Sequence, residues 1–249
     1  MGKIVAIGGG EISKPDSTAE TTEIDKEIIK LTGKKSPRLL FIPTASSDSK
    51  EYYEAVNKHF GGSLGCQTDC LYLLKESPNV IEIKKKILGS DIIYVGGGNT
   101  AKMMRAWRKY GVDEALREAY QKGIVLSGLS AGSICWFKWG NSDSRRFKKP
   151  SAELVRVSGL GLINATHCPH YLHENDRRNT LKEMMKRTPG AAIALDDCCA
   201  LEIIDETYRI IPSGKTMHAY KVYWKNHKYY EVPIPVSHEY RPVNELISV

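Results

Sequence analysis

The first half of the chain alternates short apolar runs with segments of helical periodicity. Apolar runs that are continuous rather than alternating are typical of strands buried on both faces of a sheet. Strands are predicted at residues 3–8, 38–42, 68–74, 91–95 and 124–126. Helices are predicted at residues 24–31, 51–60, 80–88, 100–110 and 113–122. This alternation predicts the α/β class, with a mostly parallel sheet flanked by helices on both faces.

Beyond about residue 141 the pattern loosens. Short strands are predicted at residues 191–195, 199–204 and 208–211, and a hairpin is predicted from residues 219–224 and 228–232 around Asn226. No internal repeat or low-complexity linker interrupts the chain. A single α/β domain can run to roughly 250 residues, so we expect residues 1–249 to form one domain.

Composition places the chain among ordinary globular proteins, with 41% apolar and 26% charged residues. No apolar stretch approaches the roughly 18 residues of a membrane span, so no membrane partner is expected. The chain starts directly in a predicted strand, without the features of a secretory signal, which favours a cytoplasmic protein. The cysteines form no C-x-x-C pair and are expected to be reduced and mostly buried.

The charge balance is basic, with 36 Lys and Arg against 29 Asp and Glu, a net charge of +7. A basic surface can bind the phosphates of nucleic acids. The densest basic clusters lie at residues 84–86 and 145–149. We interpret both as solvated surface, and no nucleic-acid partner is expected.

Residues 128–132 read G-L-S-A-G, a G-x-S-x-G motif directly after an apolar run. In a nucleophile elbow the serine sits on a sharp strand-to-helix turn, and the flanking glycines avoid crowding of the turned backbone. Ser130 is therefore the candidate nucleophile. The amide of Ala131 would face the oxygen that develops negative charge. The alternative is a Ser/Gly-rich turn that only begins a helix.

A serine hydroxyl needs a base to take its proton. Three of the seven histidines, His167, His170 and His173, lie close together. Pro169 fixes the backbone before His170 and favours an ordered loop over a helix. We therefore expect His170 to be the base.

A carboxylate should orient that histidine. Asp143 is preferred, because it lies in a polar segment between the serine and the histidine. Glu174 and Asp176 remain alternatives, and Asp143 could instead cap a turn.

Residues 96–100, G-G-G-N-T, also follow an apolar run and begin a helix. Such a loop can bind an anion with its backbone amides, and here it would supply a second oxyanion donor. Neither this segment nor the glycines at 8–10 complete G-x-G-x-x-G or the P-loop pattern, so no nucleotide cofactor is expected.

His167, His170 and His173, together with Cys168, could instead bind a transition metal. Their i, i+3, i+6 spacing fits one helical face poorly, and Pro169 argues against a helix there. No metal site is expected.

Three segments taken together, residues 96–100, 128–133 and 169–171, resemble the serine peptidases of the peptidase E (aspartyl dipeptidase) and cyanophycinase clan. The resemblance covers about residues 3–211 and implies a class I glutamine amidotransferase-like (flavodoxin-like) three-layer sandwich. It implies a cofactor-free hydrolase with Ser130 as nucleophile and His170 as base. The implied oxyanion hole consists of amides near Gly97 or Gly98 and Ala131. The family's acidic residue lies a little beyond the serine, and Asp143 is the nearest match.

The resemblance also implies a small peptide substrate, either a short peptide with N-terminal aspartate or a β-linked aspartate-arginine polymer. An acidic substrate group needs a cation. Arg177 and Arg178 follow the histidine segment and could bind it, although surface arginines are common. Asn99 in the glycine-rich loop is a further candidate for substrate binding.

Two other functions stay open at this point. A non-catalytic module could keep the serine turn and bind a small acidic ligand. An α/β-hydrolase esterase is disfavoured by the short span between Ser130 and His170. The sequence also allows a homodimer.

Overall fold

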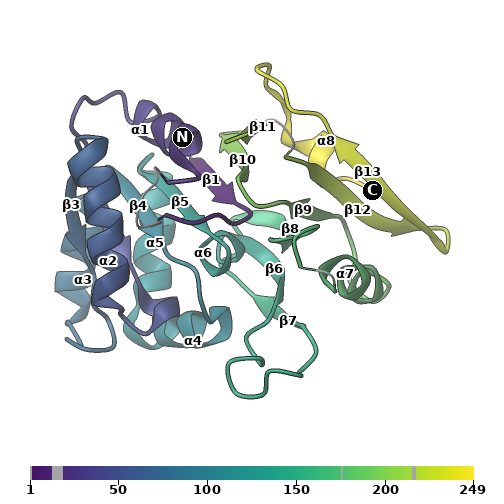
Figure 1. The fold of residues 1–249 in the computed structure, drawn as a ribbon, viewed down its shortest axis with the longest axis horizontal. Helices are drawn as coiled ribbons and strands as arrows, with labels where there is room; N and C mark the ends of the chain where they lie inside the picture. The colour runs from purple at the N-terminus through teal and green to yellow at the C-terminus, as the bar shows by residue number, and fades with distance from the viewer. Residues whose placement is uncertain (1, 13–18, 175, 215–216) are drawn as a thin grey trace.

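The computed structural model describes residues 2–12, 19–174, 176–214 and 217–249, which form two mixed β-sheets with helices packed on them (Figure 1). All six cysteines are buried, as predicted. No helix within these ranges has the length and apolar character needed to cross a lipid bilayer.

The larger sheet has eight strands in the order β14-β11-β10-β1-β5-β4-β2-β3. Its parallel part consists of β1 (Lys3–Ile7), β5 (Val125–Leu129), β4 (Ile92–Val95), β2 (Arg38–Ile42) and β3 (Gln67–Cys70). Antiparallel strands extend it beyond β1, namely β10 (Cys199–Ile204), β11 (Thr207–Pro212) and β14 (Arg241–Pro242).

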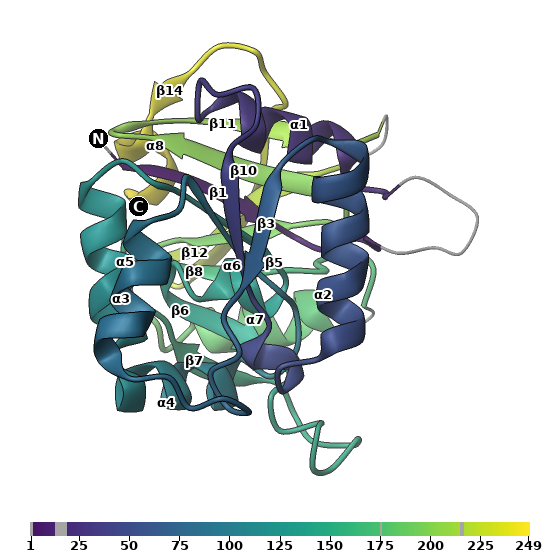
Figure 2. The ribbon, with the colours of Figure 1, turned by 90° about the vertical axis from the view of Figure 1, so that its left-hand side faces the viewer.

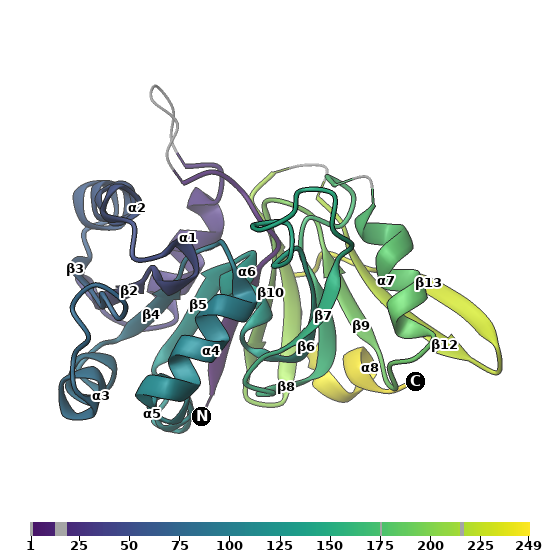
Figure 3. The ribbon, with the colours of Figure 1, turned by 90° about the horizontal axis from the view of Figure 1, so that it is seen from below.

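Helices cover both faces of the parallel part (Figure 3). One face carries α1 (Thr22–Lys30) and α2 (Lys50–Val56), and the other carries α3 (Val80–Leu88), α4 (Thr100–Tyr110) and α5 (Val112–Gln121). Successive side chains of a strand point to opposite faces. Val5 and Ile7 accordingly pack in the cluster that includes α1, whereas Ile4 and Ala6 join the cluster that includes α3.

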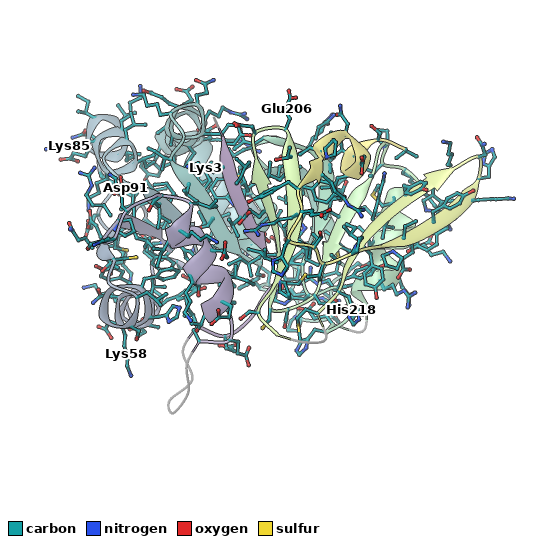
Figure 4. All side chains as sticks on the ribbon, turned by 90° about the horizontal axis from the view of Figure 1, so that it is seen from above. Lys3, Lys58, Lys85, Asp91, Glu206 and His218 are labelled. Atoms are coloured by element: carbon teal, nitrogen blue, oxygen red, sulfur yellow. The ribbon has the colours of Figure 1, made fainter. Side chains whose placement is uncertain are left out.

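Short helical segments add to these elements. A 3-10 turn, η1 (Thr44–Ser46), follows β2, and the π-helical segment η2 (Asn57–Ser63) continues α2. Figure 2 shows the α2 side and the α3–α5 side of the sheet at opposite edges of the view. The surface lysines Lys58 and Lys85 point outward from these two sides in Figure 4.

The smaller sheet has six strands in the order β13-β12-β9-β8-β6-β7. They are β6 (Phe137–Ser142), β7 (Val155–Ser158), β8 (Ile163–Cys168), β9 (Ala192–Leu195), β12 (Ala219–Lys225) and β13 (Lys228–Ile234). Helix α6 (Ala131–Ile134) contacts both sheets, through β5 and β6, and the later helices are α7 (Arg177–Met185) and α8 (Val243–Ile247). Leu181 and Met185 of α7 pack on Ala192, Ala194 and Val222 of this sheet.

The predicted α/β class is confirmed, and so is the β12–β13 hairpin, whose turn residues Asn226 and His227 have φ of 50° and 61°. The parallel part matches the alternation of the first half. The alternation of strands and helices does not predict the antiparallel strands or the second sheet. Residues 141–144 were expected to be a polar loop, but Asn141 and Ser142 are fully buried at the end of β6.

Candidate active site

Ser130 lies in the turn between β5 and α6, with φ of 55° and ψ of −113°. A non-glycine residue with positive φ is strained, and such residues concentrate at functional sites. The flanking glycines allow the turn to pack closely. A Cβ on Gly132 would lie 2.1 Å from the carbonyl oxygen of Val95, and one on Gly128 would lie 2.6 Å from the carbonyl oxygen of Gly132. The G-x-S-x-G segment is therefore a sharp strand-to-helix turn, as predicted.

His170 follows β8 and reaches the serine from the other sheet. Its φ is 54°, and its backbone N–H donates to the carbonyl oxygen of Gly8 at 3.2 Å. Its Nε2 lies 2.8 Å from Ser130 Oγ. The two side chains that the sequence suggested as nucleophile and base are thus within hydrogen-bonding distance of each other.

Asp197 holds the other side of the imidazole. It lies in the turn after β9, and its Oδ1 is 2.5 Å from Nδ1 of His170. Since a carboxylate accepts, Nδ1–H donates to Asp197, which leaves Nε2 to accept from the Ser130 hydroxyl. Burial raises the pKa of Asp197, but the hydrogen bond and charge of His170 outweigh it and lower the pKa below its ordinary value. Asp197 is therefore ionised at neutral pH.

Asp143 does not take this place, which corrects the sequence-based choice of the carboxylate. Its Oδ2 lies 4.0 Å from Nη2 of Arg177, because it follows directly after β6 and faces α7. The two alternatives also lie elsewhere. Glu174 Oε2 accepts from Nε of Arg177 at 2.7 Å, and Asp176 pairs with Arg146.

The sequence did contain a signal for Asp197. Asp196 and Asp197 follow immediately after the predicted buried strand 191–195. Ligands and chemistry collect at the carboxyl ends of strands in α/β sheets. An acidic pair at that position is therefore a candidate for the carboxylate, although it lies outside the serine and histidine segments.

The glycines at 8–10 also belong to this site. A Cβ on Gly9 would lie 2.1 Å from Asp197 Oδ1 and 2.4 Å from Cε1 of His170. A side chain at this position would push apart the two groups that are hydrogen-bonded to each other. This glycine-rich loop makes room for the histidine and the carboxylate.

The predicted oxyanion donors differ in their surroundings. Ala131 begins α6, so its amide is among the first helical amides, which have no acceptor within the helix. Gly97 lies beside the serine, since a Cβ there would be 3.5 Å from Cβ of Ser130, but its N–H donates to the hydroxyl of Tyr52 at 3.2 Å. Gly98 packs against η1, where a Cβ would lie 2.4 Å from the carbonyl oxygen of Ala45.

Asn99 caps a helix and does not line the cleft that contains the serine. Its Oδ1 accepts from the backbone N–H of Lys102 at 2.9 Å, and its Nδ2 donates to the carbonyl oxygen of Ser144 at 3.1 Å. Both ends of the amide are therefore occupied by structural contacts at the start of α4. These contacts do not support the prediction that Asn99 binds substrate.

The two arginines expected to bind an acidic substrate are not in the cleft either. Arg177 is only 2% exposed, and besides Glu174 it donates from Nη1 to the carbonyl oxygen of Asn141 at 2.8 Å. Arg178 is exposed and pairs with Glu231, Nη2 to Oε1, at 2.9 Å. Arg177 is a buried structural residue and Arg178 a surface residue, so neither is placed to bind substrate.

The serine opens into a cleft of about 790 Å³. Its described lining is strongly acidic. The lining carboxylates are those of Glu11, Glu20, Glu51, Glu174 and Asp197, and the remaining lining residues are Gly10, Ile12, Tyr52, Ala55, Gly97, Leu129, Ser130, His170 and His173. No lysine or arginine is among these residues.

The other two clustered histidines have separate surroundings. His167 is fully buried, with Nδ1 2.9 Å from the carbonyl oxygen of Ile193 and Nε2 2.8 Å from Ser133 Oγ. His173 is exposed, and its Nδ1 lies 3.8 Å from Asp197 Oδ2. Within the described ranges, no group of three or more His, Cys, Asp or Glu side chains is arranged to hold a metal ion.

A serine on a strained turn, followed in line by a histidine and a carboxylate, is the arrangement of serine hydrolases. The chain belongs to peptidase family S51, whose family model matches residues 4–211. It is therefore a peptidase of the serine type.

Individual relatives agree with this family. The chain is 35% identical to an uncharacterized peptidase, YgaJ, of Bacillus subtilis, over 96% of this chain and 99% of that protein. It is 26% identical to peptidase E of a Nostoc species, over 82% and 84% of the two chains. The crystal structure of a peptidase from an acI-B1 Actinobacterium shares the fold, with a TM-score of 0.71 at 19% identity and 97% coverage of each chain.

Proposed function

We propose that the protein hydrolyses peptide bonds through an acyl-enzyme formed on Ser130, with His170 as base and Asp197 as its orienting carboxylate. The observation that carries this proposal is the line of contacts from Ser130 Oγ to His170 Nε2, 2.8 Å, and from His170 Nδ1 to Asp197 Oδ1, 2.5 Å.

Ser130, His170 and one water molecule account for every proton transfer and every bond made or broken in the reaction. Nε2 of His170 takes the proton of Ser130 as Oγ forms a bond to the substrate carbonyl carbon. The C–N bond then breaks, and His170 returns the proton to the leaving amine. A water molecule next attacks the ester while its proton passes to Nε2. Release of the acid returns that proton to Oγ and restores the serine.

Asp197 acts through the imidazole. It keeps the proton on Nδ1, so that Nε2 is free to accept from the serine, and it stabilises the imidazolium that forms during each step. Its lowered pKa supports this role, because the carboxylate stays charged at neutral pH.

The charge of the cleft supports a substrate with a free, protonated amino terminus and a neutral or basic first residue. Five carboxylates line the cleft, of which Asp197 is hydrogen-bonded to His170 and Glu174 is paired with Arg177. An α-ammonium group or a lysine or arginine side chain is complementary to that charge. An aspartate side chain would meet no lysine or arginine among the described lining residues, and Arg177 and Arg178 are occupied elsewhere.

The test is release of free amino acid from α-linked dipeptides that vary only the first residue, namely Lys-X, Arg-X, Ala-X, Glu-X and Asp-X, together with the β-linked β-aspartyl-arginine. Wild type and Ser130→Ala are compared, with circular dichroism to check that both are folded. We expect Ser130→Ala to lose about 10⁴- to 10⁶-fold in rate. We expect wild type to prefer basic or neutral first residues over aspartate.

Three results would contradict different parts of the proposal. A preference for Asp-X or β-aspartyl-arginine would overturn the substrate class and leave the mechanism standing. A Ser130→Ala variant as fast as wild type would overturn the nucleophile. A wild type without turnover on every member would favour a non-catalytic binding module on this fold.

A further inference from the structure

The hydroxyl of Tyr52 lies in the cleft next to the amide of Gly97, which the sequence suggested as an oxyanion donor. Tyr52 belongs to α2 and lines the same cleft as Ser130. Its Oη accepts the N–H of Gly97 at 3.2 Å, and Gly97 is the glycine beside the serine. The ring is fixed by an edge-on contact with Phe41, with ring centroids 5.0 Å apart.

The Tyr52 hydroxyl carries one proton, and the hydrogen bond from Gly97 does not use it. Because Oη accepts from Gly97, the Tyr52 proton must point toward another acceptor. No described residue offers Tyr52 an acceptor within hydrogen-bonding distance. The proton is therefore free to point into the cleft, toward a group that the substrate brings.

The contact also changes the part that Gly97 can take. An amide that already donates to Tyr52 cannot donate fully to an oxyanion as well. A hydroxyl held by that amide is, in contrast, a donor fixed in place before substrate arrives, and such preorganised donors stabilise a developing negative charge most effectively.

Resting on the proposed function, we propose that the Tyr52 O–H donates a hydrogen bond to the oxyanion of the tetrahedral intermediate, beside the amide of Ala131. Gly97 then acts as a positioning residue, since its N–H orients the tyrosine. Burial raises the pKa of Tyr52 to about 12, so the phenol keeps its proton across the pH range in which a histidine base works.

The test compares Tyr52→Phe with Tyr53→Phe, each of which removes only a hydroxyl. Tyr53 lies on the same helix, and its hydroxyl is near the backbone carbonyl of Thr68, 3.4 Å away, rather than in the cleft. Loss of one oxyanion donor costs about 10²- to 10³-fold in kcat, and we expect Tyr52→Phe to lose that much with little change in KM. Tyr53→Phe should stay within about twofold of wild type.

A second measurement separates direct donation from a structural effect. A peptide aldehyde adds to Ser130 Oγ and forms a tetrahedral adduct with an oxyanion, whereas an uncleaved peptide bound to a Ser130→Ala background forms none. We expect Tyr52→Phe to weaken aldehyde inhibition by about the same factor as kcat and to leave peptide binding unchanged. Equal weakening of both would show that Tyr52 shapes the cleft and would overturn direct donation.

Labelling with a fluorophosphonate, read by mass spectrometry, separates this proposal from the proposed function. Wild type should be labelled on Ser130, and Ser130→Ala should not. An unlabelled, inactive wild type would overturn the serine mechanism itself. A labelled, active wild type together with a Tyr52→Phe variant of undiminished kcat and aldehyde affinity would overturn only the role of Tyr52 and return the second donor to the Gly97 amide.

Discussion

Asp197 Oδ1 lies 2.5 Å from Nδ1 of His170, although 27 positions separate the two residues in the chain. The contact follows from topology. β8 and β9 are parallel neighbours, so the segments after them leave the sheet at the same edge. His170 comes from the segment after β8 and Asp197 from the segment after β9. The pairing of two strands therefore places the base beside its carboxylate.

Replacing Asp197 with Asn should remove the charge that fixes the proton of His170 on Nδ1. An amide can present the wrong group to Nδ1, and the imidazolium loses its counter-charge. We expect kcat to fall by about 10³- to 10⁴-fold with the fold intact. The measurement is steady-state hydrolysis of the best dipeptide of the panel, with circular dichroism as the check on folding.

Asp143→Asn is the matched control, because Asp143 was the carboxylate favoured by its place in the sequence. Its Oδ2 lies 4.0 Å from Arg177, away from His170. We expect kcat within a few-fold of wild type, about threefold at most. A large loss in Asp143→Asn with Asp197→Asn nearly unaffected would reverse the assignment.

The candidate site was predictable from the sequence only where a local motif encodes a local shape. Ser130 could be named because its glycines are required by the turn that carries it. His170 could be named because Pro169 restricts the backbone before it. Asp197 has no such local requirement. Its role depends on which strand lies beside β8, and a pattern of apolar residues along one chain does not specify strand order.

Gly9→Ala should separate His170 from Asp197 without changing either side chain. The added Cβ would lie 2.1 Å from Asp197 Oδ1 and 2.4 Å from Cε1 of His170, so at least one of them must move. A displacement of about 1 Å in a catalytic group can cost roughly 10²-fold in rate, and we expect a loss of that order in kcat.

Gly62→Ala is the control, because it makes the same substitution of glycine by alanine at another position. A Cβ on Gly62 would have no atom within 4 Å, and the residue lies in η2, away from the cleft. Its kcat should equal that of wild type. Full activity in Gly9→Ala would mean that the backbone of residues 8–10 shifts to accommodate the Cβ. The hydrogen bond between His170 and Asp197 would then be kept.

Arg177→Met should destabilise the protein far more than Arg178→Met. Arg177 is 2% exposed and donates to Glu174 and to the carbonyl oxygen of Asn141, which would both lose a partner. We expect a loss of roughly 2–4 kcal/mol in the free energy of unfolding, less than for a fully buried pair because the Glu174 side chain is 33% exposed. Arg178 is 58% exposed, and its partner Glu231, 10% exposed, keeps a hydrogen bond from the Tyr229 hydroxyl, so the loss in Arg178→Met should be smaller, about 1 kcal/mol.

Urea unfolding of the two variants measures this difference, and KM for the best dipeptide gives a second comparison. KM of Arg178→Met should be unchanged, because this arginine does not line the cleft. A rise in KM of tenfold or more would restore Arg178 as a substrate-binding residue.

The fold could be predicted more fully before about residue 141 than after it. Strands β1, β2 and β4, and the first part of β5, could be predicted because they are apolar runs that alternate with helices. β6 was not recognised, since it ends in Asn141 and Ser142. Partners far along the chain bind these buried polar residues, since Thr180 Oγ1 accepts from Asn141 Nδ2 at 3.1 Å and Thr100 Oγ1 accepts from Ser142 Oγ at 3.3 Å. Such partners cannot be identified before the fold is known.

His167 should make the stability of the protein depend on pH. It is buried between the carbonyl oxygen of Ile193, to which Nδ1 donates, and the hydroxyl of Ser133, which lies 2.8 Å from Nε2 and 2.8 Å from the carbonyl oxygen of Ser130. Burial lowers its pKa to about 3, against 6.5 for an ordinary histidine. Below pH 6.5 the His167 imidazole is therefore protonated in the unfolded chain but neutral in the folded chain. The stabilisation is complete above pH 6.5 and is lost progressively as the pH falls toward 3.

Urea unfolding at pH 7 and pH 5 should show this contribution as a loss of about 2 kcal/mol at the lower pH. His167→Asn keeps a donor toward Ile193 but cannot titrate, so its loss between the two pH values should be smaller than that of wild type by this amount, whatever its stability at pH 7. His227→Asn, in the exposed β12–β13 turn, should keep the slope of wild type. Equal slopes in His167→Asn and wild type would mean that the buried imidazole is protonated in the folded protein and donates from Nε2 to the Ser133 hydroxyl, whose own proton goes to the carbonyl oxygen of Ser130.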